Sequence, residues 1–198
     1  MLDATVECIS RHGLTRTSLS DIAREMGVSP STVYRKVGSV ENAALLVSAR
    51  EGHRMLERAP EVVAGLSGSR VITAFLAAAV ESWRDHPMVA KILRDETEWV
   101  GRLATRDLDE LHRQGAEAAA PLLAAAMAAG LIRRQDPLAL GHWISRIGLT
   151  CLVAPPPGDL RDNLDDLLVP MLQLPDESAV SGPADAPGAP VGSSGAAG

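Results

Sequence analysis

The fold of this chain is restricted most by one segment with two helix starts and a glycine between them, TSLSDIAREMGVSPSTVYRKV. Ser18 with Asp21 three residues later is typical of a capping box. Ser29 followed by Pro30 is typical of an N-cap before the first helical position. Gly27 permits the positive φ that a tight reversal between helices needs. We therefore predict a helix, a turn and a second, short helix here.

Composition favours helices in the rest of the chain as well. Of the 198 residues, 46% are apolar but only 3% are aromatic, so the core is built from Ala, Leu and Val. Few aromatic residues disfavour strands. The two cysteines cannot form a disulfide framework, which indicates a reducing compartment, the cytoplasm. We see no signal peptide and no apolar run long enough to span a membrane.

Apolar periodicity, caps and prolines together divide the chain into segments. We expect helices over 1–12, 18–26, 30–36, 40–58, 70–85, 88–102, 105–130, 136–153 and 159–173, with a loop at 59–69 and no strand. Pro121 is expected to break or kink the helical region 105–130, because proline lacks the backbone donor. The tail 175–198 is expected to be disordered, since nineteen of its twenty-four residues are Pro, Gly, Ala or Ser.

Charge is distributed unevenly, although the net charge of the chain is −6. Residues 10–36 carry five Lys/Arg against two Asp/Glu, whereas residues 61–198 carry eleven against eighteen. A local basic face binds phosphates even on an acidic molecule. The same pattern also fits an ordinary solvated surface, so charge alone does not decide between the two.

The second helix of the pair has the properties of a recognition helix, which lies in the major groove of DNA. It is short, and its outward residues are polar: Ser31, Thr32, Tyr34, Arg35 and Lys36. The helix starts at Thr17 and Ser29 are expected to present free amides to phosphates. Val28 is expected to fill the small core between the helices. The alternative is a helical hairpin that only packs.

Residues 1–47 resemble the DNA-binding domain of the TetR (tetracycline-repressor) family. The resemblance is carried by Gly13-Leu14, Thr17-Ser18-Leu19, Asp21-Ile22-Ala23, Gly27-Val28-Ser29, Thr32-Val33-Tyr34 and Ser39. It implies an all-α homodimer with a three-helix helix-turn-helix DNA-binding domain over 1–46. It also implies a helical effector-binding and dimerisation domain over 47–174, joined to the first by the fourth helix.

The resemblance also implies the residues that contact double-stranded DNA. Thr17, Ser18 and Tyr34 would contact phosphates. The residues at or near base edges would be Pro30, Ser31, Thr32, Arg35 and Lys36.

The sequence departs from the family pattern in ways that remove cations. Val40 stands where the family often has Lys, and Ser20 stands where it often has Arg. Val37 replaces the usual aromatic residue, and the chain begins within the first helix without a basic arm. These departures predict weak operator binding with a shallow salt dependence.

Two C-terminal helices carry apolar stripes with spacings of four, three and four residues. The stripes are Leu140, Ile144, Ile147 and Cys151, then Leu160, Leu164, Leu167 and Met171. Such a pair fits a four-helix interface between two copies, with Gly141 and Gly148 allowing close approach. The alternative is that both stripes pack within one chain.

A small-molecule effector is implied by the family, and its pocket is expected between the C-terminal helices. The candidate lining residues are Trp83, Met88, Trp99, Leu103, His112, Met127 and Trp143, with Arg146 as a further polar partner. Each of the Trp and Met residues also fits a plain core position.

Neither an enzyme nor a metal or cofactor site is expected. The five histidines are scattered, with no pair at helical spacing, and there is no nucleophile elbow, P-loop or dinucleotide motif. We predict a sequence-specific DNA-binding transcriptional regulator, a repressor released by a small molecule. Two alternatives remain: a helical ligand-binding or scaffold dimer whose DNA-binding domain has decayed, and a small all-α enzyme.

Overall fold

The computed structural model describes residues 1–102 and 108–173, and these residues form eleven helices without a strand. The helices are α1 (Leu2–His12), α2 (Leu19–Met26), α3 (Pro30–Val37), α4 (Val40–Glu57), α5 (Ala59–Val62), α6 (Arg70–Asp85), α7 (Pro87–Asp95), α8 (Thr97–Arg102), α9 (Leu108–Ala128), α10 (Pro137–Val153) and α11 (Leu160–Leu172). The predicted all-α class is confirmed. The predicted tail 175–198 and Leu103 lie outside the described residues.

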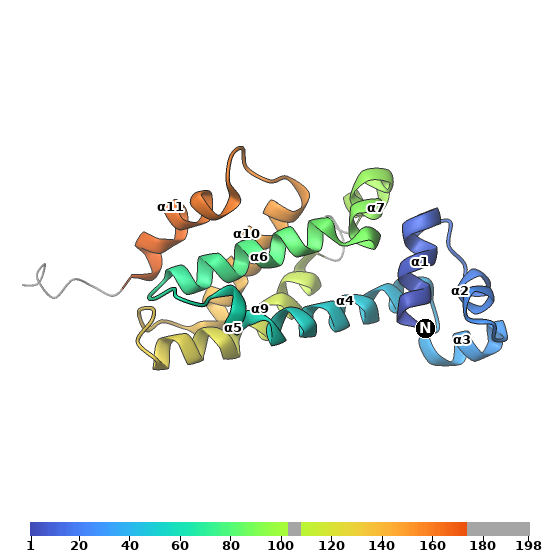
Figure 1. Cartoon of the computed structure of the whole chain (residues 1–198), viewed down its shortest axis with the longest axis horizontal. Coiled ribbons are helices and arrows are strands. Elements are labelled where there is room, and N and C mark those ends of the chain that lie inside the picture. Colours follow the sequence, from blue (N-terminus) through green and yellow to red (C-terminus); the bar gives the residue numbers. More distant parts are fainter. Residues whose placement is uncertain (103–107, 174–198) are drawn as a thin grey trace, which may run out of the picture.

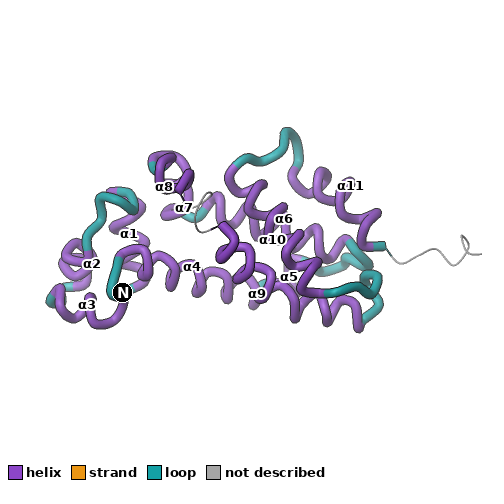
Figure 2. Tube along the Cα trace, turned by 180° about the vertical axis from the view of Figure 1, so that it is seen from behind, coloured by secondary structure: helices purple, strands orange, loops and turns teal. Residues whose placement is uncertain are grey.

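The molecule is elongated, with the first three helices at one end (Figure 1). Helix α4 runs from this end into a larger body formed by α5, α6, α9, α10 and α11. Helix α7 lies beside α1, so the chain returns to the N-terminal end after α6 (Figures 1 and 2). Two connections therefore join the N-terminal helices to the body, one through α4 and one through α7.

Apolar side chains from both connections share one core with the N-terminal helices. Ile9 of α1, Ile22 of α2 and Val33 of α3 are almost completely buried in it. Met88 and Ile92 of α7 belong to the same cluster, as does Val47 of α4. The predicted domain boundary between 46 and 47 lies inside the continuous helix α4.

Two helix predictions were wrong in detail. The expected loop 59–69 contains the short helix α5. The expected helix 88–102 is two helices, because Glu96 leaves the helical conformation between α7 and α8 at φ −117° and ψ 44°. Of the break or kink expected at Pro121, the break is absent, because α9 runs through this residue from Leu108 to Ala128. Pro121 and Glu117 both face solvent, so water can bind the carbonyl that loses its intrahelical donor.

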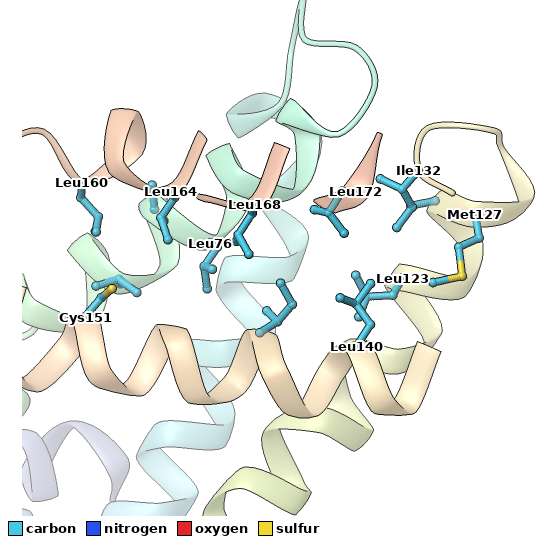
Figure 3. Packing of buried hydrophobic residues seen from close by; sticks show 14 residues of the cluster. Leu76, Leu123, Met127, Ile132, Leu140, Cys151, Leu160, Leu164, Leu168 and Leu172 are labelled. Carbon is cyan, nitrogen blue, oxygen red and sulfur yellow. The ribbon is translucent and has the colours of Figure 1, made fainter. Parts of the chain in front are cut away.

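The body has its own apolar core between α6, α9, α10 and α11 (Figure 3). Glycines let two of these helices approach α10 closely. A Cβ on Gly141 would lie 2.8 Å from the carbonyl oxygen of Ala116 in α9, and a Cβ on Gly148 would lie 3.1 Å from Leu76 Cδ1 in α6. The two glycines thus allow close helix contacts within one chain. The sequence analysis had predicted them at a contact between two copies.

The same core contains most residues of the two apolar stripes that the sequence analysis assigned to a dimer interface. Five of the eight stripe residues are buried within the chain: Leu140, Ile144, Cys151, Leu160 and Leu164. Ile147 is half-buried and packs against the same cluster. Only Leu167 and Met171 are exposed, at 53% and 51%. The alternative reading, packing within one chain, therefore holds for six residues, because α6 and α9 cover that face of the two helices.

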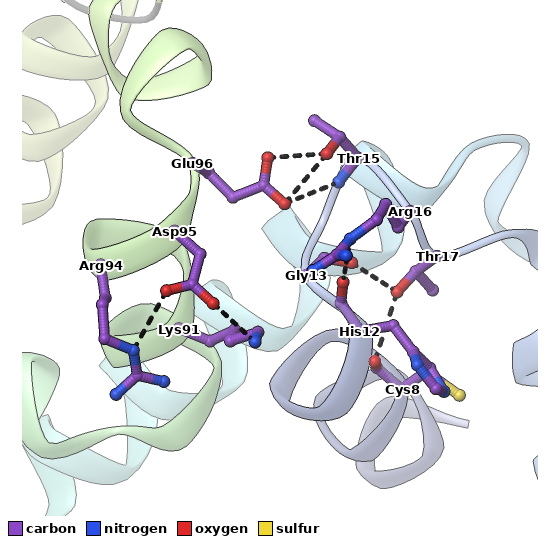
Figure 4. Close-up of polar contacts among 10 residues, drawn as sticks. All are labelled: Cys8, His12, Gly13, Thr15, Arg16, Thr17, Lys91, Arg94, Asp95 and Glu96. Carbon is purple, nitrogen blue, oxygen red and sulfur yellow. Dashed lines mark hydrogen bonds and ion pairs between the residues drawn. The ribbon is translucent and has the colours of Figure 1, made fainter.

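A buried carboxylate at the α7–α8 junction joins the body to the α1–α2 turn (Figure 4). Glu96 accepts a hydrogen bond from the backbone N–H of Thr15 at 3.2 Å. It also accepts one from the Thr15 hydroxyl, whose Oγ1 lies 2.7 Å from Oε2 and 3.0 Å from Oε1. Gly13, at φ 88°, passes so close to Glu96 that a Cβ there would collide with its Oε1.

No helix in residues 1–102 and 108–173 has the length and hydropathy needed to cross a membrane. Within the same ranges, no group of three or more His, Cys, Asp or Glu side chains is arranged to hold a metal ion.

We predict opposite effects of alanine at two helical glycines. Gly141→Ala should lower the free energy of unfolding by about 1–2 kcal/mol, because the clash with Ala116 outweighs the gain in helix propensity. Gly52→Ala in α4, where a Cβ meets nothing within 4 Å, should raise it by about 0.5–1 kcal/mol. Urea denaturation measures both. Stabilisation by both substitutions would contradict the close approach of α9 and α10.

We also predict that the Glu96 contact contributes to stability. Glu96→Ala leaves the Thr15 N–H unpaired, so the free energy of unfolding should fall by about 2–3 kcal/mol in urea denaturation. Glu98→Ala, an exposed residue of the neighbouring helix α8, is the control and should change it by less than about 0.5 kcal/mol. A double-mutant cycle with Thr15→Val that gives less than about 0.5 kcal/mol of coupling would contradict a direct bond.

Candidate nucleic-acid interface

Helix α2 begins with the predicted capping box. The backbone N–H of Asp21 donates to Ser18 Oγ at 3.2 Å, and the backbone N–H of Ser18 donates to the Asp21 carboxylate at 2.9 Å. The hydrogen bonds from Ser18, and then Arg24, hold the pKa of Asp21 below its usual value. The capping box therefore occupies the backbone amides of Ser18 and Asp21.

Helix α2 ends at Gly27, which takes the left-handed conformation at φ 66° and ψ 30°. The N–H of Val28 donates to the carbonyl of Ala23 at 3.0 Å, and the N–H of Gly27 donates to that of Arg24 at 3.1 Å. This is a Schellman motif, and it sets the angle at which α3 leaves. The prediction that Val28 fills the core was wrong: its side chain is 38% exposed, because the left-handed turn directs it outward.

Helix α3 has one buried face and one exposed face. Val33 and Val37 are 1% and 2% exposed and pack in the core with Ile22 and Ala23 of α2. The side chains on the opposite face are all exposed: Ser31, Tyr34, Arg35 and Lys36. Tyr34, the only tyrosine of the chain, is 64% exposed. Its ring is a large apolar surface with a polar hydroxyl, which suits contact with a partner.

The start of α3 is open, in contrast to the start of α2. Ser29 is the N-cap, but its side chain makes no capping hydrogen bond. Instead its Oγ lies 3.0 Å from Ser31 Oγ and 2.8 Å from Thr32 Oγ1, so three hydroxyls gather at this end. Pro30 occupies the first turn. Hydroxyls and uncapped amides at a helix N-terminus are well suited to bind phosphate oxygens.

Thr17 does not belong to this surface, which corrects one predicted site residue. Its side chain is buried, and its hydroxyl lies 2.6 Å from the carbonyl oxygen of Gly13 and 3.3 Å from that of Cys8 (Figure 4). The hydroxyl therefore ties the α1–α2 turn to the end of α1. Thr17 supports the position of Ser18 and does not itself face solvent.

Of the five cations between residues 10 and 36, two are neutralised within the domain. Arg11 pairs with Glu7 and Glu25, and Arg24 pairs with Asp21. Within the described part of the chain, the other three make no ion pair: Arg16, Arg35 and Lys36. The Nε of Arg16 donates only to the backbone carbonyl of His12.

Sequence reasoning missed a residue that fixes the end of α3. The side-chain amide of Asn42 donates to the carbonyl of Val37 at 2.9 Å, and its backbone N–H donates to Ser39 Oγ at 3.0 Å. Asn42 therefore joins the end of α3 to the start of α4. The Ser39 N-cap three residues earlier was the available signal. Val40, where the family often has a cation, is buried in the core.

The structure does not bring the predicted effector residues together in one cavity. Met88 is buried in the N-terminal core and Trp99 packs beside it, whereas Met127 belongs to the core of the body. Trp143 is 65% exposed. The predicted effector residues do not line one cavity, because α7 and α8 pack toward α1 while α9 and α10 lie in the body.

Two members of that set have surroundings of their own. His112 is buried, and its Nδ1 lies 3.3 Å from Ser145 Oγ; burial, and then Arg146, lower its pKa. Trp83 lines a cavity of about 150 Å³ between α4 and the end of α6. Among the predicted effector residues that the structure describes, it is the only one that lines this cavity.

Comparison with known proteins identifies the N-terminal part of the chain. Residues 1–39 match the family described as bacterial regulatory proteins, tetR family. A search of curated proteins finds no match.

Solved structures with a similar fold cover most of the chain. QsdR, a TetR family transcriptional repressor from R. erythropolis, has a TM-score of 0.65 and 21% identity over 86% of this chain and 91% of that chain. AlkX, a TetR family repressor from Dietzia sp. implicated in biodegradation of n-alkanes, has a TM-score of 0.64 and 18% identity over the same shares, 86% and 91%.

A third structure contains a ligand. FadR from Bacillus subtilis, solved in complex with stearoyl-CoA, has a TM-score of 0.54 and 18% identity over 86% of this chain and 95% of that chain. At sequence identities of 18–21%, the similarity to these structures shows the fold of the chain. The family match concerns the N-terminal residues 1–39. Residues 1–39 thus match the tetR family of bacterial regulatory proteins, and the fold of the chain is similar to that of TetR family repressors.

Proposed function

We propose that the protein is a homodimeric transcriptional repressor that reads a double-stranded DNA operator with α3 and is released by a small molecule. The DNA-binding domain comprises residues 1–46, and residues 47–174 bind the effector and form the dimer. It acts in the cytoplasm, where the bacterial chromosome lies, by binding and not by catalysis.

The observation that carries this proposal is the two-sided character of α3. Its apolar face is buried against α2, while Arg35 and Lys36 project from the opposite face without a carboxylate partner in the described residues. A helix held in this way presents polar side chains to base edges. Ser18, Ser29, Pro30, Ser31, Thr32 and Tyr34 complete the proposed surface.

Intact packing of α3 favours an operative domain over a decayed one. Val37, which replaces the usual aromatic residue, is 2% exposed, so the smaller side chain is fully packed. Caps and turn are also complete: the α2 capping box, the Gly27 turn and the Asn42 bond to Val37. A domain without a binding function has no need to keep all of these features together.

A second copy of the chain fits the exposed apolar residues of the last two helices. Five large apolar side chains are exposed on α10 and α11: Leu138, Trp143, Val153, Leu167 and Met171. Exposed large apolar side chains are candidates for an association surface. Two copies are also needed to place recognition helices on two half-sites. The proposed interface thus keeps the two predicted helices but uses their outer faces.

Ligand control is supported by the fold alone. FadR from Bacillus subtilis holds stearoyl-CoA, and its fold covers 86% of this chain. A ligand that binds one arrangement of the two recognition helices better than another shifts operator affinity. Helices α4 and α7 are the two connections through which such a shift reaches α3.

We predict that Lys36→Ala weakens operator binding and its salt dependence. Three unpaired cations per protomer give about six per dimer, so the slope of log K against log salt should be about −5. Lys36→Ala should reduce its size by about two, one contact per protomer. The measurement is a gel-shift titration at several salt concentrations with DNA flanking the gene.

Arg24→Gln is the matched control, because Arg24 is already paired with Asp21. This substitution should leave the slope unchanged. A wild-type slope steeper than about −9, or equal effects of both variants, would contradict the proposed surface. A folded dimer that shifts no fragment at low salt would contradict DNA binding itself.

We predict that charges on the outer face of α11 separate the two copies. Leu167→Glu together with Met171→Glu should raise the dimer dissociation constant at least about tenfold, because two carboxylates would be desolvated at the contact. Sedimentation velocity measures it. Leu56→Glu, a 40% exposed leucine of α4, is the control and should leave the dimer intact. A wild-type chain that is monomeric at micromolar concentration rejects the homodimer.

A further inference from the structure

A cavity of about 150 Å³ lies where the two connections to the DNA-binding domain meet. One wall is α4, which contributes Glu51, Arg54 and Met55, together with Arg58 directly after the helix. The other wall is the end of α6, with Trp83, and the corner between α6 and α7, with His86. None of these residues has a role in the surface proposed to bind DNA.

The cavity has one apolar side and one cationic side. Met55 is buried, and the rings of Trp83 and His86 lie with their centroids 6.0 Å apart at an interplanar angle of 54°. The Glu51 carboxylate is already shared, since Arg50 and Arg54 both donate to it, at 2.8 and 3.0 Å. Within the described residues, Arg58 has no ion pair, so the lining carries two guanidinium groups against one carboxylate.

A buried polar atom in the lining lacks a partner. The Nδ1 atom of His86 is buried and makes no hydrogen bond within the described residues. Burial lowers the pKa of His86, which favours the neutral form of its ring. A buried polar atom without a partner is destabilising, and a bound polar group would relieve that cost.

The cavity adjoins the elements that hold the DNA-binding domain. His86 is the N-cap of α7, and α7 carries Met88 into the N-terminal core and ends at Glu96, which binds Thr15. Helix α4 leads from the cavity to Ser39, directly after α3. A molecule between α4 and the α6–α7 corner therefore touches both connections.

We propose that this cavity binds a small organic monocarboxylate with one ring or a short aliphatic chain, and that binding changes operator affinity. The carboxylate pairs with Arg58, and the body of the ligand lies against Met55 and Trp83. The size follows from the volume, since a cavity of about 150 Å³ holds a single benzene ring. Only the effect on operator affinity rests on the proposed function, because binding itself needs no DNA.

Benzoate is the probe, and isothermal titration of the full chain without DNA is the first measurement. We expect saturable binding below about 10 mM, the range for a ligand of this size. Benzyl alcohol, which has the ring without the charge, should bind at least about tenfold more weakly. Absence of saturable binding, or equal binding of benzyl alcohol, would overturn the proposal.

Variants locate the site. Arg58→Gln should weaken benzoate binding at least about tenfold, and Ser82→Phe should abolish it by filling the cavity. Arg134→Gln, an exposed arginine outside the cavity, should bind benzoate like the parent chain. Thermal unfolding checks that each variant is folded. Equal loss in Arg58→Gln and Arg134→Gln, or no loss in either, would refute this site.

Coupling to DNA is measured separately by gel shift with and without saturating benzoate. We expect at least about a threefold change in operator affinity for the parent chain and none for Arg58→Gln. Benzoate that binds at Arg58 without changing operator affinity overturns the regulatory half alone. If no DNA fragment binds, the proposed function fails while the titration still decides whether the cavity binds carboxylates.

Discussion

Met88 and Ile92 reach from α7 into the core that also holds Ile9 and Ile22. Burying two aliphatic side chains contributes about 3–6 kcal/mol, which is a large fraction of the stability of a small domain. Three short helices alone are close to the lower size limit for independent folding. The recognition helix therefore depends on a helix that lies fifty residues further along the chain, and Glu96 strengthens the same contact through Thr15. The orientation of α3 thus depends on contacts with α7 as well as on the N-terminal helices themselves.

Charge is arranged around this core so that few cations remain free. Carboxylates neutralise Arg11 and Arg24 on α1 and α2, whereas Arg35 and Lys36 at the end of α3 have none in the described ranges. Ion pairs on an exposed surface add little stability, so the pairing matters mainly for the electrostatic field. It leaves positive charge concentrated on the face of α3 that is not packed, and a phosphate backbone is attracted to that face.

The sequence does not show which element packs against a buried helix face, and the incorrect predictions have this origin. Leu140 and Leu164 stand in perfect apolar stripes, but a stripe states only that a helix face is buried, not by which chain. Thr17 has the residue type of a phosphate ligand, and its burial depends on the path of the α1–α2 turn. Residue type alone does not show which effector candidates share a cavity, and the return of α7 to α1 separates Met88 from Met127.

The start and end of each N-terminal helix follow from short-range interactions that the sequence specifies. Ser18, Gly27, Ser29 and Pro30 specify where helices start and end, because caps and positive φ are interactions within a few residues. The exposed face of α3 follows from Val33 and Val37 at helical spacing. Long-range packing, in contrast, makes α7 complete the N-terminal core, brings Glu96 to Thr15, and places α6 and α9 over the stripes of α10 and α11. These contacts join residues far apart in the chain, and no local pattern records which distant partner a buried face will meet.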